Sequence, residues 1–235
     1  TVIKFLSKQP EKIFENFHII HNLYIKNKCF LKRKTYSMDG EDLQIKKYFN
    51  NKKKGFYVDV GAYHPIQRNN TMLLHEMGWE GINIDISDFS IKLFDRLRPN
   101  DTNLNIAVSK TNGYVEMFYQ KKLSQLHTIK KEIANNVFQG KLKSKKILSK
   151  TMNEILKETK YFKKKIDFLD IDVEGADLEV LESLDFSEYS PELICVEYIG
   201  EDKKNSDIFN FLINKNYKNI WSGVFSHIFE LTAKT

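Results

Sequence analysis

Residues 55–65 have the sequence Gly-Phe-Tyr-Val-Asp-Val-Gly-Ala-Tyr-His-Pro, in which a short apolar run ends at an acid and a glycine. Aromatic and β-branched residues favour a buried strand here, and Gly61 permits the sharp turn that follows it. A second run of the same kind, Gly-Ile-Asn-Ile-Asp-Ile at 81–86, places Asp85 about 26 positions after Asp59. The two runs therefore predict strands of an α/β sheet, each ending near a carboxylate.

The same alternation of apolar strands and amphipathic helices continues to the end of the chain. The predicted strands are 56–60, 81–86, 103–108, 166–172, 191–198, 217–221 and 225–232, and the predicted helices are 69–78, 88–97, 151–159, 176–184 and 206–214. Such alternation predicts a mostly parallel, seven-stranded sheet with helices on both faces. The short link between the last two strands requires antiparallel pairing, so we expect a C-terminal antiparallel hairpin.

The chain outside this alternation falls into two segments. Residues 1–36 mix apolar residues at near-helical spacing with many lysines, which predicts a helical extension of one or two amphipathic helices. These helices could cover the core, form a homodimer face or make peripheral contact with a membrane. Residues 37–235 form the main domain, with a lysine-rich insert at about 120–165 and a small hairpin expected at 113–119.

The positive charge of the chain is mostly lysine. The net charge is +6, and only four of the 37 basic residues are arginine. Because proteins that read bases depend on arginine for bidentate contacts, we expect no nucleic-acid partner. Residues 120–165 hold 14 lysines against three glutamates. This segment is either a solvated surface or one that attracts an anionic acceptor, such as a sugar nucleotide.

Two further features bear on the compartment. No run approaches the ~18 uncharged apolar residues that a membrane-spanning helix needs, so we expect no transmembrane segment. The two cysteines, Cys29 and Cys195, lie far apart without the spacing of a zinc site or a disulfide framework. We therefore expect a reducing, cytoplasmic setting.

Acidic residues stand at the ends of four predicted strands: Asp59, Asp85, Asp170 with Asp172, and Glu197. In open α/β sheets, ligands bind in the crevice beyond the carboxyl ends of the strands. A buried sheet does not ordinarily place a carboxylate at the end of four strands without a use for it. The sequence therefore predicts a ligand site at this edge of the sheet.

The turn after the first strand indicates the class of cofactor. Gly61 and the small Ala62 would let a ligand approach the backbone, but the second and third glycines of a dinucleotide fingerprint are absent. A nicotinamide dinucleotide is therefore disfavoured. A cofactor without phosphate that carries a cationic centre and an amino-acid tail would suit an acid at Asp59, and Asp85 would accept hydrogen bonds from ribose hydroxyls.

A string of spaced motifs resembles one enzyme family. The motifs are Ser37-Met-Asp-Gly-Glu-Asp42, Gly55 to Pro65, Asn70-Thr71, Gly78-Trp-Glu-Gly-Ile-Asn-Ile-Asp85, Arg98-Pro99 and Phe168-Leu-Asp-Ile-Asp-Val-Glu-Gly-Ala176. In this order they resemble the FkbM family of S-adenosylmethionine-dependent methyltransferases. The resemblance implies a Rossmann-like class I methyltransferase fold. It also implies methyl transfer, most often to a hydroxyl oxygen, in members associated with bacterial surface polysaccharides such as capsules.

Two positions depart from the family pattern. Tyr63 replaces the histidine often found before His64, and Asp170 stands where many members carry lysine. The expected activity is O-methyl transfer from S-adenosylmethionine to an oxygen of a sugar, a sugar nucleotide or a surface-polysaccharide precursor, in a bacterial cytoplasm. The alternatives are a non-catalytic module that binds a glycan or an anionic polymer, and a nicotinamide-dependent sugar-nucleotide oxidoreductase.

Methyl transfer to an alcohol requires a base that takes the hydroxyl proton. The candidates for this base are His64, Asp172, Glu174, Glu197 and His227. Asp172 and Glu174 lie two positions apart on a strand-like segment, so their carboxylates are expected to point the same way. Such a pair could raise the pKa of one carboxyl or, with Glu197, coordinate Mg²⁺ or Mn²⁺. The residues expected at the cofactor are Glu41, Asp59, Gly61, Ala62, Tyr63, Asn70, Thr71, Asp85, Ile86, Ser87, Ala107 and Asp170.

Overall fold

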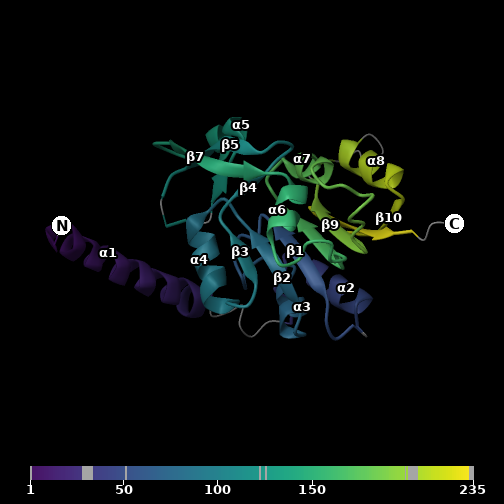
Figure 1. Cartoon of the computed structure of the whole chain (residues 1–235), viewed down its shortest axis with the longest axis horizontal. Helices are drawn as coiled ribbons and strands as arrows, with labels where there is room; N and C mark the ends of the chain where they lie inside the picture. The colour runs from purple at the N-terminus through teal and green to yellow at the C-terminus, as the bar shows by residue number, and fades with distance from the viewer. Residues whose placement is uncertain are drawn as a thin grey trace.

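The computed structural model describes residues 2–27, 34–50, 52–121, 123–124, 126–198, 200 and 206–232, and side chains from residue 11 onward (Figure 1). An α/β body fills most of the picture, and the first helix projects from one side of it. The C-terminal strands lie at the opposite side of the body from this helix.

The main sheet has seven strands in the order β10-β11-β9-β8-β1-β2-β3. They are β1 (Phe56–Val60), β2 (Glu80–Ile84), β3 (Thr102–Leu104), β8 (Phe168–Ile171), β9 (Leu193–Glu197), β10 (Tyr217–Ser222) and β11 (Ser226–Leu231). The first five pair in parallel, and β11 runs antiparallel to both β9 and β10. The predicted mostly parallel sheet with a C-terminal antiparallel hairpin is thus confirmed. The strand order reverses at β1, which pairs with β2 on one side and β8 on the other, so the ligand crevice is expected there.

Alternation along β1 separates the two faces of the sheet. Phe56, Val58 and Val60 belong to an apolar cluster with α6, α7 and α8, whereas Tyr57 joins the opposite cluster with α2 and α3. The helices are α1 (Val2–Ile20), the π-helical η1 (His21–Lys26), α2 (Glu41–Tyr48), α3 (Met72–Glu76), α4 (Asp88–Leu97), α5 (Lys131–Val137), α6 (Met152–Glu158), α7 (Asp177–Glu182) and α8 (Asp207–Asn214). Because successive side chains of a strand point to opposite faces, a strand buried on both sides needs a nearly continuous apolar sequence.

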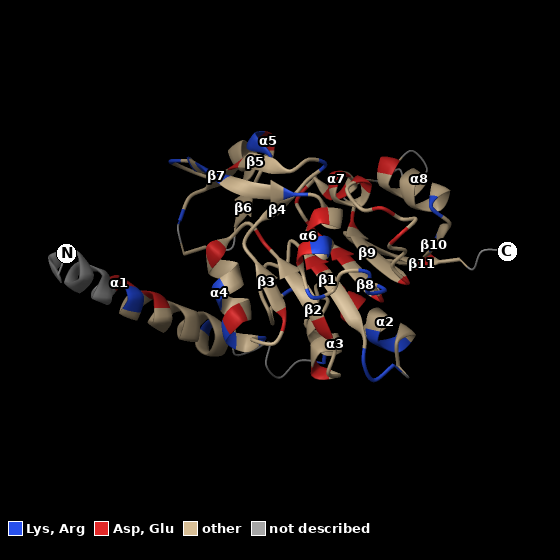
Figure 2. Cartoon of the chain, in the orientation of Figure 1, with Lys and Arg blue, Asp and Glu red and all other residues tan. Residues whose placement is uncertain are grey.

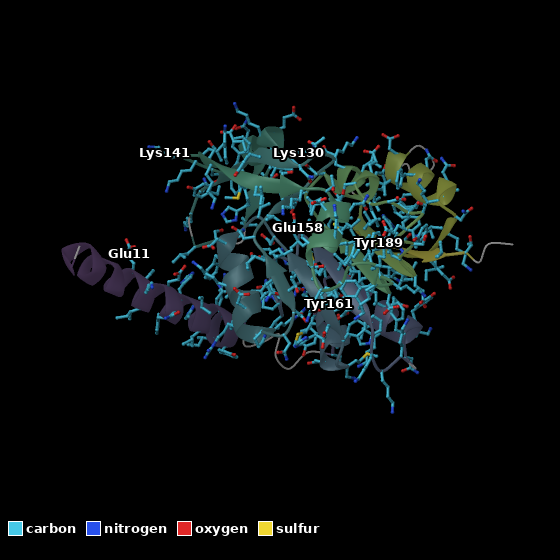
Figure 3. The ribbon with its side chains drawn as sticks, viewed as in Figure 1. Glu11, Lys130, Lys141, Glu158, Tyr161 and Tyr189 are labelled. Atoms are coloured by element: carbon cyan, nitrogen blue, oxygen red, sulfur yellow. The ribbon has the colours of Figure 1, made fainter. Side chains whose placement is uncertain are left out.

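A second sheet spans residues 107–150 and so coincides only in part with the predicted insert at 120–165. Its order is β4-β7-β5-β6, formed by β4 (Ala107–Val108), β5 (Gly113–Tyr119), β6 (His127–Thr128) and β7 (Lys143–Lys150). The expected hairpin at 113–119 is instead a single strand that pairs antiparallel along its whole length with β7. The second sheet is tied to the main domain by Lys130, whose ammonium lies 2.6 Å from the carboxylate of Glu179 in α7 (Figure 3).

The predicted strand at 103–108 was wrong as a single element. Its first part is β3, which pairs with β2, and its last part is β4, which pairs with β7 of the second sheet. The break falls at Asn105, whose side-chain amide donates a 3.0 Å hydrogen bond to the Asp85 carbonyl. At this point β2 has ended, so the chain has no further partner in the main sheet and passes to the second one.

One side of the N-terminal segment covers the core. Ile19 and Leu23 pack in an apolar cluster with Phe89 and Leu93 of α4. Farther toward the N-terminus, α1 leaves the body, and Glu11 lies on this projecting part (Figure 3). Within the described residues, no helix combines the length and the apolar character needed to cross a membrane.

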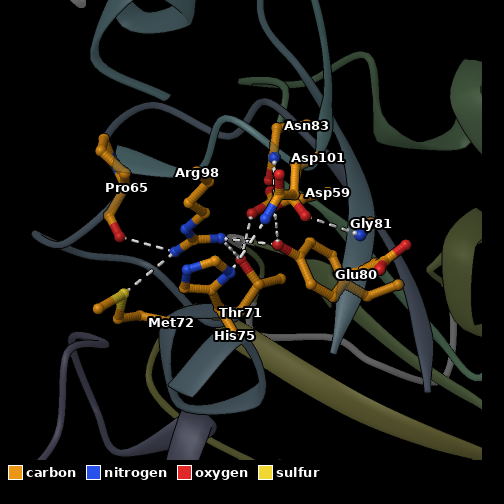
Figure 4. Close-up of polar contacts among 12 residues, drawn as sticks. Asp59, Pro65, Thr71, Met72, His75, Glu80, Gly81, Asn83, Arg98 and Asp101 are labelled. Atoms are coloured by element: carbon orange, nitrogen blue, oxygen red, sulfur yellow. Dashed lines mark hydrogen bonds and ion pairs between the residues drawn. The ribbon is translucent and has the colours of Figure 1, made fainter. Parts of the chain in front are cut away.

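The side chain of Arg98 lies fully buried after α4 (Figure 4). One terminal nitrogen donates to the Tyr57 hydroxyl at 3.0 Å and to the Thr71 hydroxyl at 2.8 Å. The other donates to the Pro65 carbonyl at 2.6 Å and to the Asn69 side-chain oxygen at 2.8 Å. The guanidinium therefore joins β1 to the whole connection between β1 and α3.

Replacing Arg98 with methionine is expected to lower the free energy of unfolding by about 3–5 kcal/mol, because it leaves buried hydroxyl, carbonyl and amide oxygens without their donor and the buried Asp59 without a nearby positive charge. The matched control is Arg96→Met, since Arg96 is exposed in the last turn of α4 and its loss should cost less than about 0.5 kcal/mol. Urea denaturation of both variants measures the difference. Equal losses in the two variants would show that the guanidinium network does not hold the β1–α3 connection.

Candidate functional site

A cavity of about 360 Å³ opens at the carboxyl ends of β1, β2 and β8. Its other wall comes from β4 and β6 of the second sheet, so it lies between the two sheets. The lining residues are Met38, Glu41, Val60, Gly61, Tyr63, Arg68, Asn70, Ile84, Asp85, Ile86, Ile106, Ala107, Val108, Leu126, His127, Thr128, Ile129, Asp172, Val173, Glu174, Ala176, Glu197, Phe225 and Ser226. This volume lies in the range of small-molecule sites.

The turn after β1 shapes the floor of the cavity. Gly61 has φ +84°, and a Cβ atom at this position would overlap the carbonyl oxygen of Asp172. The glycine was predicted to let a cofactor approach the backbone. In the structure it is the backbone at Asp172, just after β8, that lies close to Gly61. The amides of Gly61 and Ala62 both donate to the Ile84 carbonyl, at 2.9 and 3.0 Å, and so join the turn to β2.

Asp85 lies at the wall of the cavity just beyond β2. Its two carboxylate oxygens accept hydrogen bonds from the amides of Tyr63 at 2.8 Å and Ser87 at 2.6 Å. Burial raises the pKa of Asp85 to about 7, although these two amides oppose the shift. The backbone thus fixes the carboxyl group in place, and its remaining lone pairs can accept hydrogen bonds from hydroxyl groups of a ligand.

Asp172 and Glu197, which we call the carboxyl pair, both line the cavity from the ends of β8 and β9. The two carboxyl groups lie close enough to influence each other's protonation, so they titrate as a pair. Desolvation and the charge of Glu174 raise the pKa of Glu197 to about 7. Desolvation and the charges of Glu197 and Glu174 also raise the pKa of Asp172 well above its ordinary value, although its side chain keeps exposed surface. The pair can therefore accept or release a proton near neutral pH.

The metal alternative does not fit the geometry. In the described part of the chain, no three His, Cys, Asp or Glu side chains are grouped so that they could hold a metal ion. This applies to Asp172, Glu174 and Glu197, the three ligands that the sequence suggested for Mg²⁺ or Mn²⁺.

His64 is fully buried and does not line the cavity. Its Nδ1 accepts hydrogen bonds from the amides of Ile66 at 3.0 Å and Gln67 at 2.9 Å, so the ring proton resides on Nε2. That atom faces the Asn22 side-chain oxygen at 3.2 Å. Burial, assisted by the charges of Lys26 and Arg98, lowers the pKa of His64 to about 3. The neutral ring therefore joins the N-terminal segment to the loop after β1.

Two strand-end acids lie behind the cavity wall. Asp59 accepts hydrogen bonds from the Thr71 hydroxyl at 2.8 Å and the Asn69 amide at 3.2 Å. Asp170 accepts one from the Asn70 amide at 3.1 Å, and Asn70 itself lines the cavity. Asp170 thus orients a residue of the cavity lining, whereas Asp59 holds the loop behind it, and neither acid enters the cavity itself.

The structure divides the predicted site residues into two groups. Those that line the cavity are Glu41, Gly61, Tyr63, Asn70, Asp85, Ile86, Ala107, Asp172, Glu174 and Glu197. Those that lie outside the lining are Asp59, Ala62, His64, Thr71, Ser87, Asp170 and His227. His227 is buried on β11, where its ring packs 5.1 Å from that of Phe209 in α8. Ser87 instead caps α4 by accepting a hydrogen bond from the Ser90 amide.

The segment before α2 closes one side of the cavity. The buried carboxylate of Glu41 accepts a 2.8 Å hydrogen bond from the Asp39 amide. Asp39 in turn accepts a 2.8 Å hydrogen bond from the Val224 amide in the turn between β10 and β11. The two ends of the domain therefore meet at the cavity, which brings Met38 and Phe225 into its lining.

The residues that the second sheet contributes to the cavity lining were not predicted from the sequence. His127 and Thr128 of β6 line the cavity, and burial with the charge of Lys145 lowers the pKa of His127 to about 4. Nothing near these residues in the sequence marks them, because β6 is only two residues long. Arg68 was also missed, although it is one of only four arginines.

The cavity is strongly acidic. Its lining contains Glu41, Asp85 and Glu174 in addition to the carboxyl pair, and Arg68 is the single lysine or arginine among the described lining residues. A cationic ligand would be stabilised in this field, and an anionic group would be repelled.

Comparison with known proteins identifies the family. No curated protein matches the chain. The family model described as the methyltransferase FkbM domain matches residues 59–219, from the end of β1 into β10, and so includes Asp85 and the carboxyl pair. Met38, Glu41 and Phe225 lie outside the matched span. Because the match covers more than half of the 235 residues, the chain belongs to the FkbM family of methyltransferases.

Proposed function

We propose that this methyltransferase takes its methyl group from S-adenosylmethionine and transfers it to an oxygen of a sugar, a sugar nucleotide or a surface-polysaccharide precursor. The observation that carries the proposal is the carboxyl pair, which can bind a proton near neutral pH in the same cavity as Asp85. A bacterial, cytoplasmic setting stays a prediction. The non-catalytic binding module and the nicotinamide-dependent enzyme have no support from the site.

Several lining residues suit S-adenosylmethionine. The fixed carboxyl group of Asp85 can accept hydrogen bonds from ribose hydroxyls, and Ile86 with Ala107 forms an apolar wall against which an adenine can pack. Glu41 and Asn70 offer an acidic and an amide group for the amino-acid end. The bound cofactor supplies an electrophilic methyl group on a cationic sulfonium, and the acidic lining favours that charge.

The carboxyl pair is placed to act as the base. An alcohol becomes a competent nucleophile when a nearby group removes its proton as the new bond forms. When the pair of Asp172 and Glu197 holds one proton, the ionised carboxylate can accept the hydroxyl proton of the acceptor. Glu174 keeps the pKa of the pair high, which makes it a better proton acceptor at neutral pH than an isolated carboxylate.

The charge distribution indicates how an anionic acceptor would bind. Phosphate groups are disfavoured inside the acidic cavity, so the accepting sugar enters and its charged part stays outside. The lysines of β7 provide a surface for that part, and the charge of Lys145 reaches His127 in the lining. In Figure 2 these basic residues lie on the second sheet, on the far side of the body from α2 and α3.

Replacing Asp85 with asparagine is expected to weaken binding of S-adenosylhomocysteine at least tenfold, since hydrogen bonds to a charged group contribute about 1.5–3 kcal/mol. Isothermal titration calorimetry measures the dissociation constant. Asp207→Asn, an exposed acid at the start of α8, is the matched control and should leave binding unchanged. If the unaltered protein does not bind the compound, the cofactor assignment is wrong.

Loss of the base should reduce turnover without removing the cofactor. For Asp172→Asn and Glu197→Gln we expect kcat to fall about 10²–10⁴-fold. Binding of S-adenosylhomocysteine should change less than about threefold. The assay follows formation of S-adenosylhomocysteine with a panel of sugar nucleotides and free sugars. A variant of either residue that keeps full activity would exclude the carboxyl pair as the base.

The same pair predicts the pH dependence. The pKa of Glu197 is raised to about 7, so below this pH the pair is protonated and cannot accept another proton. Activity expressed as kcat/KM should therefore rise as the pH increases through about 7 and level off above it. A profile that is flat or falls between pH 6 and 8 would be inconsistent with a carboxyl base of this pKa.

A further inference from the structure

The N-terminal segment has a second apolar side that faces away from the body. Ile13, Phe17, Ile20 and Tyr24, which we call the outer stripe, are 66%, 63%, 45% and 43% exposed. Their spacing of four, three and four residues places them on one side of a helix. Ile19 lies on the opposite side, where it packs against α4.

Nothing in the described part of the chain covers the outer stripe. In Figure 1 the C-terminal end of α1 contacts the body, and the rest of the helix projects away from it. Phe14, beside the stripe, is also 62% exposed. A contiguous apolar surface of this kind on a folded protein marks an interaction site, because single exposed apolar residues are common but clusters are not.

The charge of the chain is concentrated in this same segment. Residues 1–34 contain eight lysines and arginines and only two acids, a net charge of +6. The remaining residues contain 29 basic and 29 acidic side chains, so the whole net charge of the protein belongs to the first 34 residues. Lys12 and Lys26, at the two ends of the stripe, are exposed. The apolar side therefore lies within a strongly basic segment.

We propose that the N-terminal segment binds the surface of an anionic lipid bilayer, with the outer stripe inserted among the headgroups and the lysines paired with lipid phosphates. Basic amphipathic helices bind membranes in two ways: they bury apolar side chains in the bilayer surface, and their positive charges are attracted to anionic lipids. A second copy of this chain is a poorer partner for the stripe, because a symmetric contact would bring two segments of charge +6 together. The proposal does not depend on the methyl-transfer reaction.

The test is co-sedimentation of the full chain with vesicles of phosphatidylcholine, with and without phosphatidylglycerol. We expect binding to the anionic vesicles only, weakened by raised salt, which screens the attraction between charges. The double variant Phe17→Ser/Ile20→Ser should lower the partition constant at least tenfold, since each substitution removes a side chain that the lipid would bury. Circular dichroism checks that this variant keeps the fold.

The matched control is Phe162→Ser/Ile213→Ser, which alters two side chains of 50% and 57% exposure elsewhere on the body. It should bind anionic vesicles as the unaltered protein does. The proposal is overturned if the unaltered protein does not bind anionic vesicles, or if the control loses binding to the same extent. It is also overturned if analytical ultracentrifugation shows a dimer that only Phe17→Ser/Ile20→Ser breaks, while vesicle binding is unaffected by that variant.

Discussion

The buried guanidinium of Arg98 is the constraint on which the cavity depends. It bonds the Tyr57 hydroxyl of β1 and three groups of the connection between β1 and α3, so a loop rich in polar residues is held against the sheet. Through Thr71 it also reaches the buried carboxylate of Asp59. An isolated buried charge is costly, but here each of the two terminal nitrogens donates to two oxygen acceptors. The same connection carries Tyr63 and Asn70 into the cavity lining.

The cavity itself concentrates groups that oppose folding. Burial raises the pKa of Asp85, and desolvation with neighbouring carboxylates raises the pKa values of the carboxyl pair, although Asp172 keeps exposed surface. A protein selected only for stability would not retain such groups. In the proposed reaction they would have two uses that an isolated surface carboxylate lacks: they would favour a cationic cofactor, and they would supply a proton acceptor matched to neutral pH.

Two surfaces beside the cavity carry exposed lysines but face different surroundings. The second sheet brings His127 into the cavity lining and carries exposed lysines on β7, and under the proposed function it would distinguish acceptors. The N-terminal segment joins the loop after β1 through Asn22 and His64, yet its outer stripe faces away. If the segment lies on a membrane, this contact would hold the catalytic domain close to lipid-linked or surface-bound acceptors.

Patterns of neighbouring residues were enough to predict the seven strands of the main sheet, the C-terminal hairpin and the acids at the strand ends, because strand periodicity and turn chemistry are local properties. The division between β3 and β4 and the second sheet could not be predicted, since β5 and β7 pair across more than twenty residues of intervening chain. Nor could the sequence separate Asp85 and Asp172, which face the cavity, from Asp59 and Asp170, which lie behind it. An acid at a strand end lines the cavity or packs against the β1–α3 connection according to the side of the strand from which it projects. Only the packed structure shows which side faces the cavity.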